Sequence, residues 1–327
     1  MKATAVAHPI QGIVKYHGMR DHQRRLPYHD SISVCTAPSH SKTTVEFSMD
    51  NDGNSYVIDG EPVEGNTDRL DRIVDAVRDR SEAPHAVYGV RMESENSFPT
   101  NVGLGSSSSG FAAFAAALAD AAELDVTLGD LSAIARQGSA SAARSVTGGF
   151  SHLRTGLNDA DCQSERIETG LEEDLRIVVG LVPAYKDTDD AHEEAVESHM
   201  FQARMAHIHG QIAECRDALR DDDFERTFNL AEQDSLSLAA TTMTGPGGWV
   251  YWQPVTLEIF STVRELREDS DVPVYFSTDT GASVYVNTTA EHVDEVEAAI
   301  EDCGVQTAVW NVGGPARILD DEEQALF

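Results

Sequence analysis

Lysine is scarce in this sequence, and charge of one sign dominates it. The 327 residues carry 56 Asp and Glu against 24 Lys and Arg, a net charge of -32, and the only lysines are Lys2, Lys15, Lys42 and Lys186. Such an acidic surface repels nucleic acid and anionic lipid, which excludes both as partners. Because salt screens self-repulsion, the composition favours a halophilic source over an acidic mesophilic one. The acidic surface also opposes anionic substrates at long range, so any phosphate site must be locally basic.

The sequence also lacks the patterns of membrane-spanning, secreted and zinc-binding proteins. No apolar run approaches the roughly 20 residues that a membrane helix needs, and residues 1–12 lack the basic start and apolar middle of a signal peptide. We therefore expect a cytoplasmic protein. The cysteines show neither a CxxC pair nor regular spacing, which argues against a zinc site or a disulfide framework and predicts inert thiols; they are Cys35, Cys162, Cys215 and Cys303.

What is present is a series of short β-type and longer helical segments, without internal repeats, low-complexity tracts or linkers. β-Branched and apolar runs predict strands at 13–16, 31–36, 43–47, 87–92, 178–182, 274–277, 282–286 and 306–310. Helical spacing predicts helices at 68–80, 111–122, 131–136, 140–146, 255–266 and 290–300, with 190–240 mostly helical. Asn51-Asp52-Gly53 is a hairpin signal. This order predicts an α+β protein, with helices on one face of a largely antiparallel sheet and a boundary near residue 180.

The most informative segment is rich in Gly and Ser, spans residues 97–110 and has the sequence SFPTNVGLGSSSSG. Gly103 and Gly105 allow the backbone to approach a ligand closely. The serines at 106–109 supply hydroxyls and the following helix supplies free N–H groups, so the segment can hold a polyphosphate. It lacks the Lys of the GxxxxGK[ST] loop and the spacing of a dinucleotide fingerprint. Composition alone supports a Gly/Ser turn that caps a helix about equally well.

The order of residues in this segment favours the phosphate-binding interpretation. Pro99-x-x-x-Gly103-Leu-Gly-Ser-Ser resembles the ATP-binding signature of the GHMP kinases, and the longer string from Phe98 to Ala113 resembles one branch, the mevalonate-diphosphate decarboxylases. Three other parts of the chain resemble that branch in the same order: IVKYHGMRD at 13–21 with LPYHDSISV at 26–34, ARQGSASAARSVTGG at 135–149, and STDTGA at 277–282. Four ordered matches are far more specific than any one of them.

The resemblance implies a GHMP kinase fold, with a ribosomal-protein-S5-like β/α domain that binds ATP at 1–180 and a ferredoxin-like α/β sandwich domain at 181–327. It implies an ATP- and Mg2+-dependent carboxy-lyase of isoprenoid biosynthesis by a mevalonate pathway. Such enzymes phosphorylate a tertiary hydroxyl of a phosphorylated mevalonate and then expel that phosphate as CO2 leaves, so magnesium and local donors must steady the moving phosphoryl group. Homodimers are common in this family, and we keep a homodimer as an expectation.

The resemblance also implies a role for each matching residue. Asp279 would be the base or acceptor for the substrate hydroxyl, Lys15 would pair with Asp279 or stabilise the departing phosphate, and Arg144 would hold the substrate carboxylate. Further substrate contacts fall to Tyr16, Ser139 and Ser141. The nucleotide would be bound by Pro99, Gly103, Leu104, Gly105, Ser106, Ser107 and Ser108, with Ser106 or Ser107 presenting an oxygen to Mg2+.

Each of these residues also has a purely structural interpretation. Asp is common in turns such as Thr-Asp-Thr-Gly, so Asp279 could be a turn residue. Lys15 suits a charge at a strand edge, and Arg144 suits a solvated helix. Ser139 and Ser141 are each typical helix caps. The family match favours the catalytic and binding roles.

Two positions in the first matching segment depart from the family pattern. Met19 stands where the family has Lys, and His17 stands where it has Trp. Because a thioether cannot pair with the substrate's distal phosphate, the simplest inference is mevalonate 5-phosphate as the substrate and isopentenyl phosphate as the product. That activity is associated with the phosphomevalonate decarboxylases of halophilic archaea. Arg20 or Arg24 could instead supply the missing charge, which keeps mevalonate 5-diphosphate and its product isopentenyl diphosphate open.

Two further classes of function stay open on the sequence. A GHMP kinase that stops after phosphorylation would share the ATP signature, and release of CO2 would separate it from a decarboxylase. A non-catalytic ATP-binding regulator would be expected to lose the Asp or the Lys, whereas this chain keeps both Lys15 and Asp279. The sequence therefore favours the decarboxylase.

Overall fold

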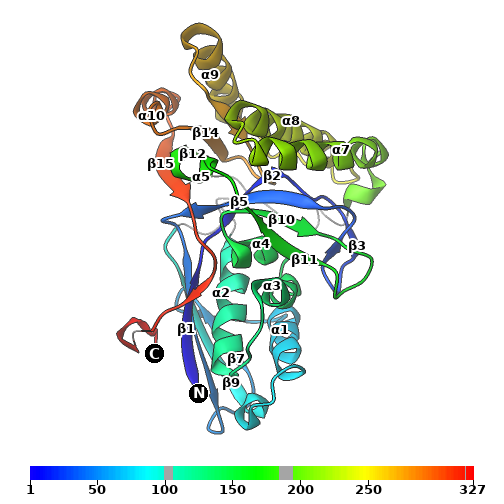
Figure 1. Cartoon of the computed structure of the whole chain (residues 1–327), viewed down its shortest axis with the longest axis vertical. Coiled ribbons are helices and arrows are strands. Elements are labelled where there is room, and N and C mark those ends of the chain that lie inside the picture. Colours follow the sequence, from blue (N-terminus) through cyan, green and yellow to red (C-terminus); the bar gives the residue numbers. More distant parts are fainter. Residues whose placement is uncertain (99–105, 184–193, 321) are drawn as a thin grey trace.

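The computed structural model describes residues 1–98, 106–183, 194–320 and 322–327 and is built around two sheets (Figure 1). The six-stranded sheet has the order β16-β1-β6-β9-β7-β8, and its strands are Arg317–Ile318, Lys2–Ala7, Ser41–Ser48, Gly89–Asn96, Ser55–Ile58 and Glu61–Pro62. The eight-stranded sheet has the order β11-β10-β5-β15-β12-β14-β13, with β2 paired to β5. Its strands are Gln163–Ile167, Phe150–Arg154, Ser31–Ala37, Gln306–Val312, Leu175–Leu181, Val284–Thr289, Tyr275–Ser277 and Ile10–Val14. β3 (Met19–Asp21) and β4 (Leu26–Pro27) form a separate pair.

A group of four helices lies beside the six-stranded sheet in the lower half of Figure 1, and α2 is the member that packs on the strands of this sheet. They are α1 (Asp68–Arg78), α2 (Ser106–Ala121), α3 (Leu128–Arg136) and α4 (Ala142–Thr147). α2 lies against β1 and β6, and the other three pack around it. Its alanines are buried on nearly all sides, because small side chains allow the sheet and three helices to approach it closely. The Ala-rich run therefore becomes the centre of the first core.

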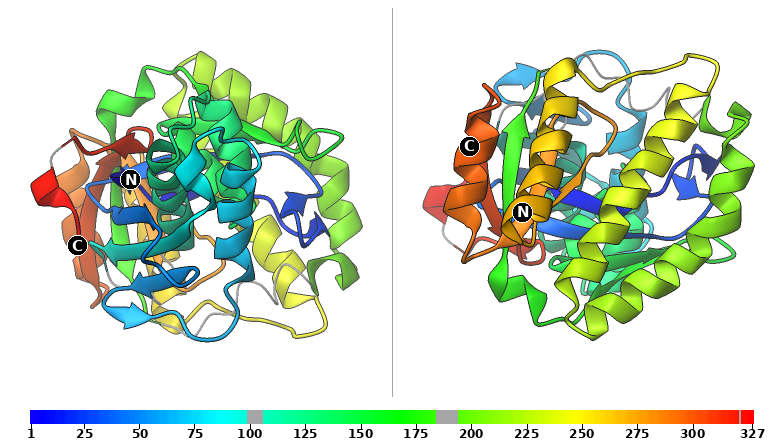
Figure 2. Two further views of the ribbon diagram at one scale, coloured as in Figure 1. Left: turned by 90° about the horizontal axis from the view of Figure 1, so that it is seen from below. Right: turned by 90° about the horizontal axis from the view of Figure 1, so that it is seen from above.

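A second group of helices covers the eight-stranded sheet. Seen from above, α7 (Phe201–Arg220) and α8 (Phe224–Met243) run side by side over it, with α9 (Pro254–Ser270) beside them (Figure 2). Asp223 caps α8 by accepting from the backbone N–H of Arg226 at 3.0 Å. α10 (Val293–Glu301) packs on β12 and β15. Shorter elements are α5 (Leu171–Asp174) and the 3-10 turns Pro84–Val87, Ala195–Glu197 and Glu322–Gln324.

The elements predicted from periodicity are confirmed, with ends displaced by a few residues. The pairing is largely antiparallel as predicted, since β7–β9 is the one parallel pair among the described strands. Strands from both sides of residue 180 share the eight-stranded sheet, because β15 pairs with β5 through Val312 and Thr36. The division into domains at 1–180 and 181–327 stays a prediction.

The hairpin predicted at Asn51-Asp52-Gly53 is wrong. The strands on either side of this turn, β6 and β7, both pair with β9 and not with each other. The side-chain amide of Asn51 donates to the carbonyl of Gly89 at 3.0 Å, which attaches the turn to the start of β9. The local signal identified a turn correctly, but the partner of each strand was chosen by pairing over a longer distance in the chain.

No helix in the described parts of the chain is long and apolar enough to cross a membrane. The cysteines are unpaired thiols, and Cys303 alone among them is only partly buried. Burial raises the pKa of Cys35 to about 12 and that of Cys162 to about 11. Thiols with such high pKa values are poor nucleophiles, in agreement with the inert role predicted for these two cysteines.

Gly89 is required where β9 passes the turn. A Cβ at this position would lie 2.5 Å from the carbonyl oxygens of both Asn51 and Gly53, and backbone atoms cannot give way cheaply. We expect Gly89→Ala to lower the free energy of unfolding by about 1–3 kcal/mol, measured by urea unfolding in concentrated KCl. In Gly210→Ala on α7 the new Cβ meets nothing within 4 Å, so this control should be neutral or stabilising by up to about 1 kcal/mol. Equal losses in both variants would contradict the steric argument.

Candidate active site

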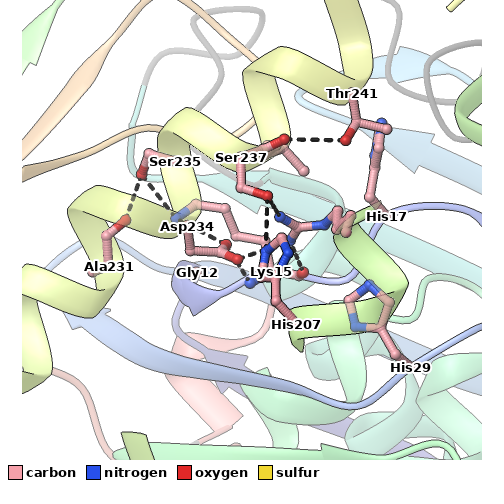
Figure 3. A network of polar contacts seen from close by, with 12 residues as sticks. Gly12, Lys15, His17, His29, His207, Ala231, Asp234, Ser235, Ser237 and Thr241 are labelled. Carbon is pink, nitrogen blue, oxygen red and sulfur yellow. Dashed lines mark hydrogen bonds and ion pairs between the residues drawn. The ribbon is translucent and has the colours of Figure 1, made fainter. Parts of the chain in front are cut away.

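Lys15 directly follows β2, and its side chain is buried beneath α8 (Figure 3). Its Nζ donates to the hydroxyls of Ser235 and Ser277 at 3.1 Å each and lies 3.8 Å from Oδ2 of Asp234. Burial lowers the pKa of Lys15, and the carboxylates of Asp234 and Asp279 oppose that shift. Lys15 is therefore an interior amine with nearby carboxylates and not a solvated charge at a strand edge.

Asp279 lies in the turn after β13 and meets Lys15 across the backbone of Gly12. The Gly12 N–H donates to Oδ1 of Asp279 at 3.3 Å, and the Ser277 hydroxyl donates to the Gly12 carbonyl at 3.2 Å. A Cβ at Gly12 would lie 2.5 Å from Cγ of Lys15 and 2.9 Å from Oδ1 of Asp279. A glycine at this position thus allows Lys15 and Asp279, which come from opposite ends of the chain, to approach each other.

Arg144 on α4 is a buried guanidinium, with only 2% of its surface exposed. Nη1 donates to the hydroxyl of Ser33 at 2.6 Å, and the guanidinium carbon lies 5.3 Å from the centre of the Tyr16 ring. Among the described residues, its Nε has no hydrogen-bond partner and no carboxylate lies within salt-bridge distance of it. Burial lowers the pKa of Arg144, with Tyr16 and then Asp279 opposing the shift. Such a desolvated cation is suited to an anionic ligand.

The predicted substrate-binding residues gather around the start of α4. The hydroxyls of Ser139 and Ser141 lie 2.7 Å apart, and Ser141, although at the N-cap position, makes no side-chain cap hydrogen bond. Tyr16 packs on a small buried cluster beneath this helix. The cluster consists of Met19, Leu26, Ala140, Ala143, Leu153 and Cys162.

The predicted phosphate segment is only partly described. Pro99, Gly103, Leu104 and Gly105 lie outside the described residues, and α2 begins at Ser106. Ser107 is exposed and Ser108 is buried. Next to Ser107 is a mainly apolar cavity of about 340 Å³, whose walls include Asn66, Arg69, Leu70, Met92 and Phe111. Sequence reasoning did not find this cavity, because three separated segments of the chain form it.

Sequence reasoning also missed two buried charges next to Lys15. Oδ2 of Asp234 on α8 accepts from the backbone N–H of Lys15 at 2.8 Å. Oδ1 of Asp234 accepts from Nη2 of Arg204 on α7 at 2.9 Å, and the same nitrogen donates to the Lys15 carbonyl at 2.6 Å. One signal was available: Asp234 is spaced at helical intervals from Ala231 and Leu238, which places it on the buried face of α8.

Comparison with known proteins identifies the family to which this site belongs. The sequence model of the diphosphomevalonate decarboxylase-like N-terminal domain matches residues 7–164. Phosphomevalonate decarboxylase from Haloferax volcanii is 68% identical over 328 residues, covering 100% of both chains. The chain belongs to the diphosphomevalonate decarboxylase-like family. The organism of this relative agrees with the halophilic source that the acidic composition predicts.

Solved structures of this family share the fold. Mevalonate diphosphate decarboxylase from Staphylococcus aureus matches with a TM-score of 0.91 at 26% identity, covering 98% of each chain. MDDEF in complex with MVAPP, AMPPCP and magnesium matches with a TM-score of 0.90 at 26% identity, covering 98% of this chain and 99% of that one. The predicted α+β class and GHMP kinase fold are confirmed.

The two buried arginines of the site should respond oppositely to loss of charge. Arg144→Met removes a buried cation without a paired carboxylate, so we expect the free energy of unfolding without ligands to rise by about 1 kcal/mol or more. Arg204→Met deprives the buried carboxylate of Asp234 of its closest cation, and we expect a loss of about 3–5 kcal/mol. Urea unfolding in concentrated KCl measures both changes. Similar losses in the two variants would contradict a ligand-binding role for Arg144.

Proposed function

We propose that this protein decarboxylates mevalonate 5-phosphate in an ATP-dependent reaction that yields isopentenyl phosphate, ADP, phosphate and CO2. The observation that carries the proposal is the 68% identity, over the whole chain, to phosphomevalonate decarboxylase from Haloferax volcanii. Further relatives that match include diphosphomevalonate decarboxylases from Ganoderma lucidum and Gibberella zeae, which favours a lyase over a kinase that stops after phosphorylation. The product belongs to isoprenoid biosynthesis by a mevalonate pathway. A cytoplasmic location and a homodimer stay predictions from the sequence.

The three buried or half-buried charges have complementary roles in this reaction. The tertiary hydroxyl of the substrate takes the γ-phosphoryl group of ATP, and Asp279 accepts the hydroxyl proton. That phosphate then leaves with the electrons of the C–O bond, while the electrons of the bond to the carboxylate form the new double bond. Arg144 orients the carboxylate before it leaves as CO2, and Lys15 stabilises the negative charge on the departing phosphate. Tyr16, Ser139 and Ser141 bind the substrate beside them.

The start of α2 and the cavity beside it suit ATP. Free N–H groups at a helix N-terminus attract phosphate oxygens, and the resemblance adds the contacts of Pro99, Gly103, Leu104, Gly105 and Ser106 to Ser108. Mg2+, with an oxygen from Ser106 or Ser107, would neutralise charge on the phosphoryl oxygens. The mainly apolar cavity of about 340 Å³ next to Ser107 suits a flat base. The cavity walls include the Phe111 ring, which carries the Arg69 guanidinium 4.8 Å from its centre.

The surroundings of Met19 favour the monophosphate over the diphosphate. Met19 is 3% exposed and belongs to the same buried cluster as Ala140 and Ala143. Ala140 lies between the two proposed substrate-binding serines, and Ala143 directly precedes Arg144. Arg20 donates to the carbonyls of Thr155 and Gly156 at 2.7 and 3.0 Å. Arg24 has an exposed side chain 4.0 Å from Asp21. Both arginines thus have bonding partners outside the Met19 cluster, which supports the monophosphate as the substrate.

The proposed reaction is tested with protein in concentrated KCl, Mg2+, ATP and substrates labelled with carbon-14 in the carboxylate. Mevalonate, its 5-phosphate and its 5-diphosphate are compared. We expect labelled CO2 and ADP from the 5-phosphate, with far slower release from the other two. ADP without labelled CO2 would point to a kinase, and release mainly from the 5-diphosphate would overturn the monophosphate assignment.

A cation restored at position 19 should move the substrate preference. A charge-assisted hydrogen bond is worth about 1.5–3 kcal/mol, so we expect Met19→Lys to raise the ratio of kcat/KM for the 5-diphosphate to that for the 5-phosphate by about tenfold or more. The ratio is taken within one preparation, so it does not depend on the folded fraction. Met19→Leu keeps the apolar packing and should leave the ratio unchanged. An unchanged ratio in Met19→Lys would show that the distal phosphate lies elsewhere.

A further inference from the structure

Lys15 occupies a place where the sheet no longer holds the backbone. β2 pairs with β5, but the register shifts between Gly12 and Val14, and the last paired residue is Val14 opposite Ile32. Lys15 lies beyond that last pair. Its position must therefore be fixed by contacts other than the strand ladder.

Asp234 and Arg204 supply those contacts. The backbone N–H of Lys15 donates to Asp234 at 2.8 Å, and the backbone carbonyl of Lys15 accepts from Arg204 at 2.6 Å. The two side chains are joined by their own bond of 2.9 Å, and all three groups are buried. Arg204 is further anchored to the Ser237 hydroxyl at 2.9 Å. Two helices thus hold both backbone polar groups of one residue.

The same carboxylate also acts on the side chain of Lys15. Oδ2 of Asp234 lies 3.8 Å from Nζ, while the hydroxyls of Ser235 and Ser277 accept from it at 3.1 Å. The side chain of Lys15 is buried, and a buried ammonium is stable only where a negative charge compensates it.

We propose that Asp234 and Arg204 are positioning residues for the reaction: together they fix the backbone of Lys15, and Asp234 keeps its amine charged and directed toward the region of Asp279. This inference rests on the proposed decarboxylation, in which Lys15 stabilises the departing phosphate. Neither residue touches the reacting atoms. Asp234 acts through the charge and place of Lys15, and Arg204 acts through Asp234 and the Lys15 carbonyl.

The charged groups around Lys15 predict the direction in which the pKa of Lys15 changes when Asp234 is neutralised, and this direction can be measured. Burial lowers the pKa of Lys15, Asp234 raises it most, Asp279 raises it less, Arg204 lowers it and Cys215 raises it slightly. Loss of the Asp234 carboxylate must therefore lower the pKa of Lys15 further. The charged amine, and the activity that needs it, would then be lost at a lower pH than in the unchanged protein.

The test uses Asp234→Asn, with Glu232→Gln as the matched control. Glu232 is a second buried carboxylate on α8, but it binds Arg267 at 3.1 Å and Arg264 at 3.6 Å and has no contact with Lys15. Misplacement of a catalytic group by about 1 Å can cost about 100-fold in rate, so we expect kcat of Asp234→Asn to fall by about that factor. KM for mevalonate 5-phosphate should change little, and Glu232→Gln should retain kcat.

The scarcity of lysine makes the charge of Lys15 directly observable. Only Lys2, Lys15, Lys42 and Lys186 give signals when the protein is labelled with carbon-13 at lysine Cε, and Lys15→Arg assigns the signal of interest. We expect the Lys15 signal to titrate at lower pH in Asp234→Asn and at unchanged pH in Glu232→Gln. An Asp234→Asn protein in which Lys15 titrates as before, with kcat per folded molecule unchanged, would overturn the proposal and leave only a structural role.

Two further measurements keep the outcomes separate. If Asp234→Asn does not fold, the double variant Arg204→Met/Asp234→Asn removes both opposite charges together and should fold, because paired buried charges are often replaceable by neutral groups. It should show the same loss of kcat; full activity in this variant would overturn the proposal. If the unchanged protein releases no labelled CO2, the proposed function fails, whereas the Lys15 titration still tests what Asp234 does.

Discussion

The carboxylate of Asp234 connects two long helices to the strand end that carries Lys15. A buried carboxylate is tolerated only when its oxygens are bonded, and here they serve Arg204, the Lys15 amide and, at 3.8 Å, the Lys15 amine. The arrangement needs segments that lie far apart in the sequence. Lys15 directly follows β2, Arg204 lies on α7 and Asp234 lies on α8. Packing of the helices on the eight-stranded sheet and placement of the amine therefore depend on the same contact.

Two buried arginines of this protein differ in their partners, and the difference supports the ligand-binding role proposed for Arg144. Arg204 donates to a carboxylate, a backbone carbonyl and a hydroxyl. Arg144 is equally buried, yet within the described residues it has one hydroxyl, one aromatic ring and no carboxylate at salt-bridge distance. A fold that desolvates a cation without pairing it loses stability. Such a cation is retained despite this cost where a ligand needs the charge. Burial alone would not separate these roles; the partners do.

The sequence was sufficient for elements and motifs and insufficient for contacts between distant segments. Periodicity located the helices, and the spacing of Lys15, Arg144 and Asp279 within ordered motifs predicted residues that the fold brings near one another. It could not predict that β7 lies beside β9, because a turn signal says nothing about the strand that pairs next to it. Asp234 and Arg204 were missed for a related reason. In a long acidic helical region, the residue type alone does not distinguish a buried charged side chain from a solvated one. The cavity beside α2 was missed because no single segment forms it.

The acidic surface and the cationic interior of this protein act over different ranges. At about 1 M salt, charges on the surface are screened within about 3 Å, so a net charge of -32 does not keep an anionic substrate away. Buried groups are screened far less. Within the described part of the site there are three cations and two carboxylates, and these are Lys15, Arg144 and Arg204 on one side and Asp234 and Asp279 on the other. Since Arg204 and Asp234 largely neutralise each other, the remaining charge is that of Lys15 and Arg144 beside Asp279. A site with this balance attracts a carboxylate and a phosphate at close range, and salt that solubilises the surface leaves that attraction intact.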